Sequence, residues 1–273
     1  MVVNMDIDSI MKNVPRDIPS MADHVANVKM FPVYLTVHYL LVTLSLRSRP
    51  GAKQFAKDHP FSSLFVSVTS CFGGAIIQSF VLGESLLKPF YNTRNVSLAA
   101  ATWYLVMFSP FDVVEEFFST KLCKGVLLVL KEVHRIRGIT DGVLIGMKLQ
   151  SGNWLLPLIL GCIRGSGAKF LMRPLDHFMR GEVMSGHELL KPHFSTKMSV
   201  ASSLFLLLQH DRYFKMSQPM MMLSLAATAA AFQLGMLLAD IRDPYEYVEN
   251  VVCSVAIKAP EALSKKDAKH HKD

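Results

Sequence analysis

Charged residues are scarce in this chain of 273 residues. Asp, Glu, Lys and Arg together make up 19% of it, whereas apolar residues make up 51% and recur in long runs. We therefore expect one integral membrane domain with short loops rather than one or two soluble domains. The net charge of +7 then indicates basic loops on the cytosolic side and contact with anionic lipid, not binding to nucleic acid.

Motifs of the common enzyme and metal-binding classes are also missing. The sequence has no Walker loop, no zinc-ligand spacing and no CxxC pair, and we interpret its four cysteines as packing residues: Cys71, Cys123, Cys162 and Cys253. An intramembrane serine protease would need Gly-x-Ser-Gly, but Arg164 stands two residues before Ser166. We therefore expect no catalytic site, no metal site and no redox cofactor. The polar first thirty residues also indicate that no signal peptide is present.

Seven apolar segments are separated by polar loops. They lie at about residues 30–46, 61–87, 96–118, 122–149, 153–179, 196–209 and 218–241. Each approaches the length that crosses a bilayer as a helix, so the pattern predicts an all-α integral membrane protein with seven transmembrane helices. Proline in the Ser109-Pro110 pair should kink the third helix.

The segments divide the chain into three parts. Residues 1–29 form an amphipathic or irregular lead-in, residues 30–242 form the membrane domain, and residues 243–273 form a lysine-rich tail that we expect to be partly disordered. Lys and Arg are more frequent in the tail and in the loops after the first, third and fifth segments. The positive-inside rule then places the C-terminus in the cytosol and the N-terminus on the lumenal side.

Glycines mark corresponding places in the second and fifth segments. Gly73 and Gly74 lie near the middle of one, and Gly165, Ser166 and Gly167 lie near the middle of the other. Two consecutive sets of three helices have opposite orientations, which predicts two inverted three-helix repeats followed by a seventh helix. The glycines then line a pore or, alternatively, only let the helices pack closely. The sequence leaves both interpretations open.

Charges interrupt the fourth segment at Lys131-Glu132-Val133-His134-Arg135-Ile136-Arg137-Gly138. Lys131 and Arg135 share one helix face, and Gly138 leaves space one turn further on. Because charges at membrane depth are costly, these cations need a counter-charge, and a phosphate headgroup would supply one. Snorkelling near a helix end is the alternative. On the helical wheel Arg137 points away from Lys131.

The same stretch carries a resemblance to a known family. Lys131-Glu132-Val133-x-Arg135, with Ile139-Thr140 and Gly142-Val143, is similar to the signature of the trimeric intracellular cation (TRIC) channels, type B in particular, and the seven segments and both glycine motifs agree with it. The resemblance implies a homotrimeric channel of the endoplasmic or sarcoplasmic reticulum membrane. It implies one pore inside each protomer, permeable to potassium and sodium, whose current balances charge during calcium release.

The resemblance also implies that phosphatidylinositol 4,5-bisphosphate is bound beside the pore by Lys131 and Arg135. The family pattern often has a further lysine where this chain has Gly138, so a role assigned to that lysine does not carry over. A secondary transporter with inverted repeats is the main alternative function. Unitary currents in a planar bilayer would distinguish a channel from it.

Overall fold

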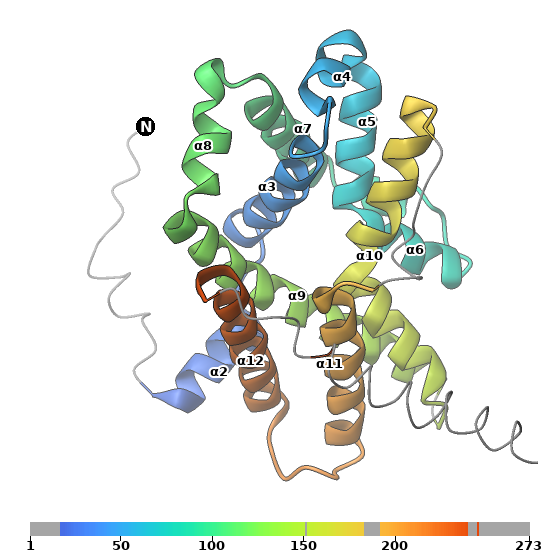
Figure 1. Ribbon diagram of the computed structural model, residues 1–273. Helices are drawn as coiled ribbons and strands as arrows, with labels where there is room; N and C mark the ends of the chain where they lie inside the picture. The colour runs from blue at the N-terminus through green and yellow to red at the C-terminus, as the bar shows by residue number, and fades with distance from the viewer. Residues whose placement is uncertain (1–16, 151, 183–191, 240–244, 246–273) are drawn as a thin grey trace, which may run out of the picture.

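The computed structural model describes residues 17–150, 152–182, 192–239 and 245. All regular structure in these residues is helical (Figure 1), which confirms the all-α prediction. In chain order the elements are α2 (Ile18–Asn27), α3 (Val33–Arg47), α4 (Ala52–Asp58), α5 (Pro60–Cys71), α6 (Gly73–Val81), η1 (Lys88–Tyr91), α7 (Thr93–Phe108), η2 (Pro110–Asp112), α8 (Val113–Ser119), α9 (Lys121–Leu149), α10 (Leu155–Arg180), α11 (Phe194–His210) and α12 (Gln218–Leu238). Most of the predicted lead-in and all but one residue of the predicted tail lie outside the described residues.

Every predicted segment contains one helix or one bent pair, but the helices are not seven continuous rods. Among the described residues, α10 and α12 are each long and apolar enough to cross a membrane. The pair α5 and α6, bent by 65°, and the pair formed by α7 and the helical turn from Pro110 to Ser119, bent by 95°, qualify if each is counted as one span. The seven-pass arrangement and its repeats therefore stay a prediction.

The two bends have local causes. Ser109 precedes a proline and adopts an extended conformation, so α7 ends at Phe108. Phe111 and Asp112 then have φ angles of 54° and 59°, and the chain turns sharply before α8. The break between α5 and α6 lies at Phe72, directly before the first glycine pair. By contrast, α10 runs unbroken through its own glycine motif, so only one of the two motifs interrupts its helix.

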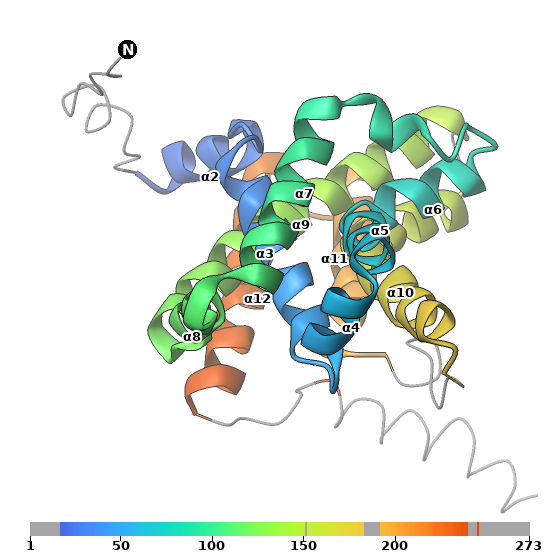
Figure 2. The same cartoon turned by 90° about the horizontal axis from the view of Figure 1, so that it is seen from above.

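The two largest apolar cores belong to different sets of helices. Residues of α3, α5 and α7 make the first core, which includes Tyr39, Val66 and Trp103. Residues of α9, α11 and α12 make the second, which includes Ile139 and Leu225. Figure 2 shows α5, α6 and α10 together on one side of the molecule, with α3, α7 and α8 on the other.

The predicted lead-in contains a helix that sequence reasoning left undefined. In α2, Ala22 and Val25 are buried and lie three residues apart, which places them on one face. Val25 joins the second core beside α9 and α12. Residues 18–27 are therefore packed onto the membrane domain.

Candidate functional site

The two glycine motifs meet in space. A Cβ atom added to Gly73 would lie 2.6 Å from the carbonyl oxygen of Gly167, and one added to Gly167 would overlap the backbone of Gly74. The start of α6 therefore crosses α10 with the two backbones in contact, which only glycine permits. The packing interpretation is supported by this geometry. Gly73 and Gly167 are at the crossing and do not line the neighbouring cavity.

A cavity of about 380 Å³ lies beside this crossing. Its walls come from α3, from the break between α5 and α6, from α9 and from α10. Six of the eight residues singled out in the sequence line it: Gly74, Lys131, Arg135, Gly138, Gly165 and Ser166. The volume lies within the range of small-molecule sites. The structure therefore brings the cationic motif and the glycine motifs into one site.

Arg135 has its counter-charge within the protein. Its Nη1 donates to both carboxylate oxygens of Glu132, at 2.6 and 2.8 Å, one helical turn earlier. Gln233 of α12 donates to the same carboxylate from the other side. Both Glu132 and Arg135 are buried. Glu132 therefore supplies the counter-charge that this arginine was expected to need, and the binding of a headgroup by Arg135 stays a prediction.

Lys131 differs from Arg135 in this respect. Within the described part of the chain it forms no hydrogen bond or ion pair, although it lines the cavity. Since Glu132 is already held by Arg135 and Gln233, it has less capacity left for a second cation. Of the two predicted ligands, Lys131 thus presents the less compensated charge to the cavity.

The cavity also holds charged residues besides Lys131 and Arg135. Arg137, Arg164 and Lys169 line it, together with the carboxylate of Asp141. On α9, residues 134, 137, 138 and 141 follow the spacing of a single helix face, and this face borders the cavity beside the face of Lys131. Arg137 therefore lies on a different face from Lys131, as expected, and still lines the cavity, because the cavity borders two adjacent faces of α9.

Two histidines stack inside the cavity. The rings of His38 on α3 and His134 on α9 have centroids 4.5 Å apart and an interplanar angle of 17°. The His38 Nε2 also lies 3.0 Å from the carbonyl oxygen of Cys71. Sequence spacing cannot predict this pair, because the two histidines lie on helices that are far apart in the chain.

Hydroxyl groups complete the cavity wall. Ser166 on α10 and Ser195 on α11 are both buried, and both line the cavity. Ser199, one turn after Ser195, fits against Gly165, where an added Cβ would overlap its hydroxyl oxygen. Ser166, which the sequence analysis placed in the glycine motif of the fifth segment, thus lines the cavity together with Gly165.

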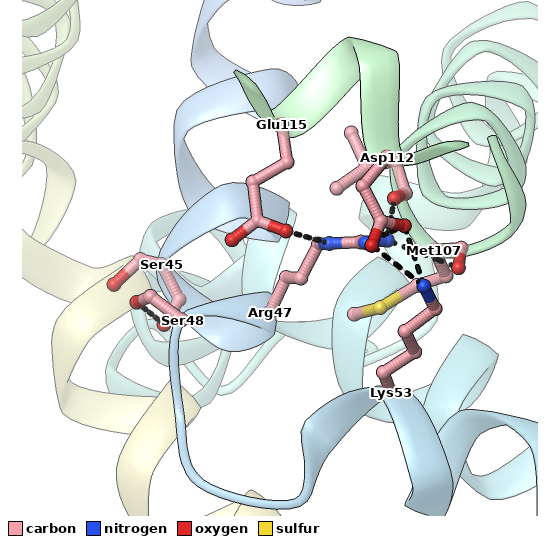
Figure 3. Close-up of polar contacts among 8 residues, drawn as sticks. Ser45, Arg47, Ser48, Lys53, Met107, Asp112 and Glu115 are labelled. Atoms are coloured by element: carbon pink, nitrogen blue, oxygen red, sulfur yellow. Dashed lines mark hydrogen bonds and ion pairs between the residues drawn. The ribbon is translucent and has the colours of Figure 1, made fainter. Parts of the chain in front are cut away.

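A second polar cluster lies where α3 ends (Figure 3). The Arg47 guanidinium donates to Glu115 at 2.5 Å, to Asp112 at 2.5 Å and to the carbonyl oxygen of Met107 at 3.0 Å. It also donates to the carbonyl oxygen of Val106. Because α7 ends before Pro110, the last carbonyl groups of that helix lack backbone amide donors. The Arg47 guanidinium donates hydrogen bonds to them instead. Lys53 of α4 binds Asp112 from the solvent side.

A third cluster ties the loop after α3 to the end of α10. Arg49 and Arg180 both bind the carboxylate of Asp176, which is buried. Arg180 also donates to the carbonyl oxygen of Pro50 at 2.8 Å. The C-terminal ends of α3, α7 and α10 therefore lie at one end of the molecule.

The cavity chemistry suits an anion better than a metal ion. Its lining combines ammonium and guanidinium groups with hydroxyls, and these are donors for phosphate. Within the described ranges, no group of three or more His, Cys, Asp or Glu residues is arranged as metal ligands.

Comparison with known proteins agrees with the resemblance seen in the sequence. The family model described as TRIC channel matches residues 49–240. A trimeric intracellular cation channel type 1B.1 from Caenorhabditis elegans is 32% identical over 232 residues, which are 84% of this chain and 78% of that protein. A type A channel from Danio rerio is 29% identical over 252 residues, covering 92% and 84% of the two chains.

Solved structures give the same answer. A structure described as a TRIC counter-ion channel in calcium release has a TM-score of 0.75 and 27% identity, and the match covers 81% of this chain and 98% of that one. A C. elegans TRIC channel in the absence of Ca²⁺ has a TM-score of 0.74 and 30% identity, with 81% and 95% covered. The family consists of membrane-embedded ion channels, not enzymes. The chain belongs to the TRIC channel family.

Proposed function

We propose that this protein is a homotrimeric, potassium-permeable channel of the endoplasmic or sarcoplasmic reticulum membrane. Sodium also permeates, each protomer contains its own pore, and the current balances charge during calcium release. Phosphatidylinositol 4,5-bisphosphate is bound beside the pore. This proposal rests on the family membership and on the cavity.

The observation that carries the proposal is the cavity between α3, α9 and α10. It gathers Lys131 and Arg135 of the motif with Gly74 and Gly165 of the two glycine segments. A polar space of this kind inside an apolar helical domain is expensive to keep unless water, ions or a polar ligand occupy it. Irregular backbone at membrane depth, such as the break at Phe72, is tolerated where it lines such a space.

The chain arrangement proposed here has seven crossings in two inverted three-helix repeats and a last helix. The clusters at Arg47 and Asp176 support it, because they gather the ends of α3, α7 and α10 at one end of the molecule, as alternating first, third and fifth crossings require. We place that end and the tail in the cytosol and the N-terminus in the lumen. A tag after Asp273 on sealed microsomes should be removed by external protease. Its survival would reverse the orientation.

Conduction is tested by recording from the purified protein in a planar bilayer with potassium chloride. We expect resolved unitary currents. With a potassium gradient across the bilayer, balanced by an impermeant cation, these currents should reverse at the potassium equilibrium potential. Substrate flux without resolved openings would favour the secondary transporter instead.

The lipid site is tested by measuring co-purified phosphoinositide by mass spectrometry. Lys131→Ala should lower bisphosphate retention by about tenfold, since a charge-assisted hydrogen bond contributes roughly 1.5–3 kcal/mol. Lys124→Ala is the matched control, because Lys124 is an exposed lysine on the same helix. Full retention of the lipid in Lys131→Ala combined with Arg135→Ala would show that the headgroup is held elsewhere.

A further inference from the structure

The turn after α7 holds an exposed phenylalanine on an unusual backbone. Phe111 and Asp112 have left-handed φ angles of 54° and 59°, and such angles are uncommon for a bulky residue like phenylalanine. Phe111 is 95% exposed, whereas the Asp112 carboxylate binds the Arg47 guanidinium of α3. The turn therefore directs an apolar side chain outward and an acidic side chain inward.

The same polarity continues along α8. Glu115 turns inward and binds Arg47 (Figure 3), whereas Val113 and Phe117, four residues apart on one face, are exposed. Phe118 packs inward, against an apolar core of α3, α7 and α9. A surface helix in water places its apolar residues inward and its charged residues outward. The outer face of α8, formed by Phe111, Val113 and Phe117, is therefore suited to an apolar environment.

Exposed apolar residues also continue on both long helices that contact α8. Tyr104 and Leu105 are exposed on α7, and Leu122 and Val126 are exposed in the first turns of α9. Apolar surface that extends over several elements marks an interaction site. Because α7 and α9 belong to the membrane domain, the outer face of α8 continues a surface that faces lipid.

The bend between α7 and α8 sets the direction of this face. α7 has 16 residues, which corresponds to a length of about 24 Å, against a hydrocarbon core of about 30 Å. The helical turn from Pro110 to Ser119 is bent by 95° from α7. When α7 crosses the bilayer, α8 therefore runs along the membrane surface. Figure 2 shows α8 at the outer edge of the molecule.

We propose that α8 is an interfacial helix that binds the membrane itself, with Phe111, Val113 and Phe117 inserted between phospholipid acyl chains just below the headgroups. The third crossing is then α7 alone. Glu116 and Lys121, which border this face, are exposed. Charged residues are depleted in the cores of protein interfaces, whereas at headgroup level they stay hydrated and Lys121 meets lipid phosphates. Phospholipid therefore suits this face better than a second copy of the chain.

The inference needs neither conduction nor the headgroup site in the cavity. The proposed orientation adds only that the leaflet is the cytosolic one.

The test measures the membrane depth of α8 with an environment-sensitive fluorescent amino acid, introduced by stop-codon suppression at one position at a time. The full chain is reconstituted into vesicles of phosphatidylcholine and phosphatidylserine whose acyl chains are brominated near the headgroup or near the chain end. At Phe111 and Phe117, bromines near the headgroup should quench more strongly. At Ala101, an exposed residue in the middle of α7, bromines near the chain end should quench more strongly. Iodide in the water should quench the fluorophore on α8 much less than the free amino acid.

Three outcomes would overturn the inference. Stronger quenching at Phe111 by bromines near the chain end would show that α8 continues the crossing. Iodide quenching as strong as that of the free amino acid would place α8 in water. Protection from both iodide and bromines would show that a protein surface, such as a second copy of the chain, covers this face. Because no outcome depends on currents or phosphoinositide, the proposed function is tested separately.

A pair of matched variants tests whether Phe111 anchors α8. Phe111→Ser removes an exposed side chain, so the fold should persist, and the fluorophore at Phe117 should lose bromine quenching and gain iodide quenching. Phe61→Ser is the control, at an exposed phenylalanine in the first turn of α5, and it should leave both signals unchanged. Equal changes in the two variants, or no change in Phe111→Ser, would show that Phe111 is not inserted.

Discussion

The first three apolar segments and the next three use their buried arginines in different ways. Arg47 is the last residue of α3, and its partners come from other elements: the carbonyls at the end of α7 and two acids beyond it. Arg135 lies in the middle of α9, and its carboxylate comes from the preceding turn of the same helix. One arginine joins elements at the end of the molecule, and the other is neutralised locally at its centre.

The cavity shows the same contrast. Its lining residues from the first half, such as Leu35, His38 and Tyr39, include no Asp, Glu, Lys or Arg, whereas α9 and α10 supply every such residue. The first half therefore gives the cavity its neutral wall, and the second half gives it its charge. Breaking each kind of arginine contact should have effects of different size.

The largest effect is expected for Glu132→Gln. This change leaves the Arg135 guanidinium buried without a counter-charge, which typically costs about 3–5 kcal/mol. We expect a large fall in the thermal midpoint of the detergent-solubilised protein. The midpoint is measured by fluorescence-detected size-exclusion chromatography after heating. Glu116→Gln, at an exposed position near α9, is the control. A midpoint equal to that of the control would show that Glu132 does not stabilise Arg135.

The second largest loss of stability is expected at the crossing of α6 and α10. Gly167→Ala places a methyl group on the backbone of Gly74, and such overpacking costs about 1–3 kcal/mol. Gly138→Ala is the matched change on α9, where the nearest atom to the new Cβ would be 3.5 Å away, so it should be neutral. The same thermal assay applies. Equal stability of the two variants would contradict close backbone contact at Gly167, and Gly167→Leu should prevent folding.

The smallest effect is expected at Lys53, in the cluster of Figure 3. Arg47→Gln removes the donors for the carbonyls of Val106 and Met107, and buried acceptors without partners cost about 1–3 kcal/mol. Lys53→Gln should cause a smaller shift, because the Lys53 side chain is 45% exposed and that of Arg47 only 2%. A larger shift for Lys53→Gln would show that the surface contact with Asp112, not the capping of α7, holds the bend.

Periodicity and composition predicted much of this molecule from single segments. The apolar runs predicted the helices of the membrane domain, the Ser109-Pro110 pair predicted the bend after α7, and the charges of α9 identified one wall of the cavity. Each of these predictions depends only on residues of the same helix, because the spacing along a helix decides which side chains share a face.

Contacts between residues of different helices were decided only by the tertiary structure, because they depend on the distances between helices and on which helix faces meet. Gln233 reaches Glu132 across 101 positions, and His134 stacks on His38 of another helix. Arg137 reaches the cavity because the space borders two faces of α9. The sequence determined that α9 carries charges that an apolar environment cannot hold alone. The packing of α3, α10 and α12 around it decided which charge is neutralised within the protein and which faces the cavity, because that depends on distances between helices that no single segment encodes.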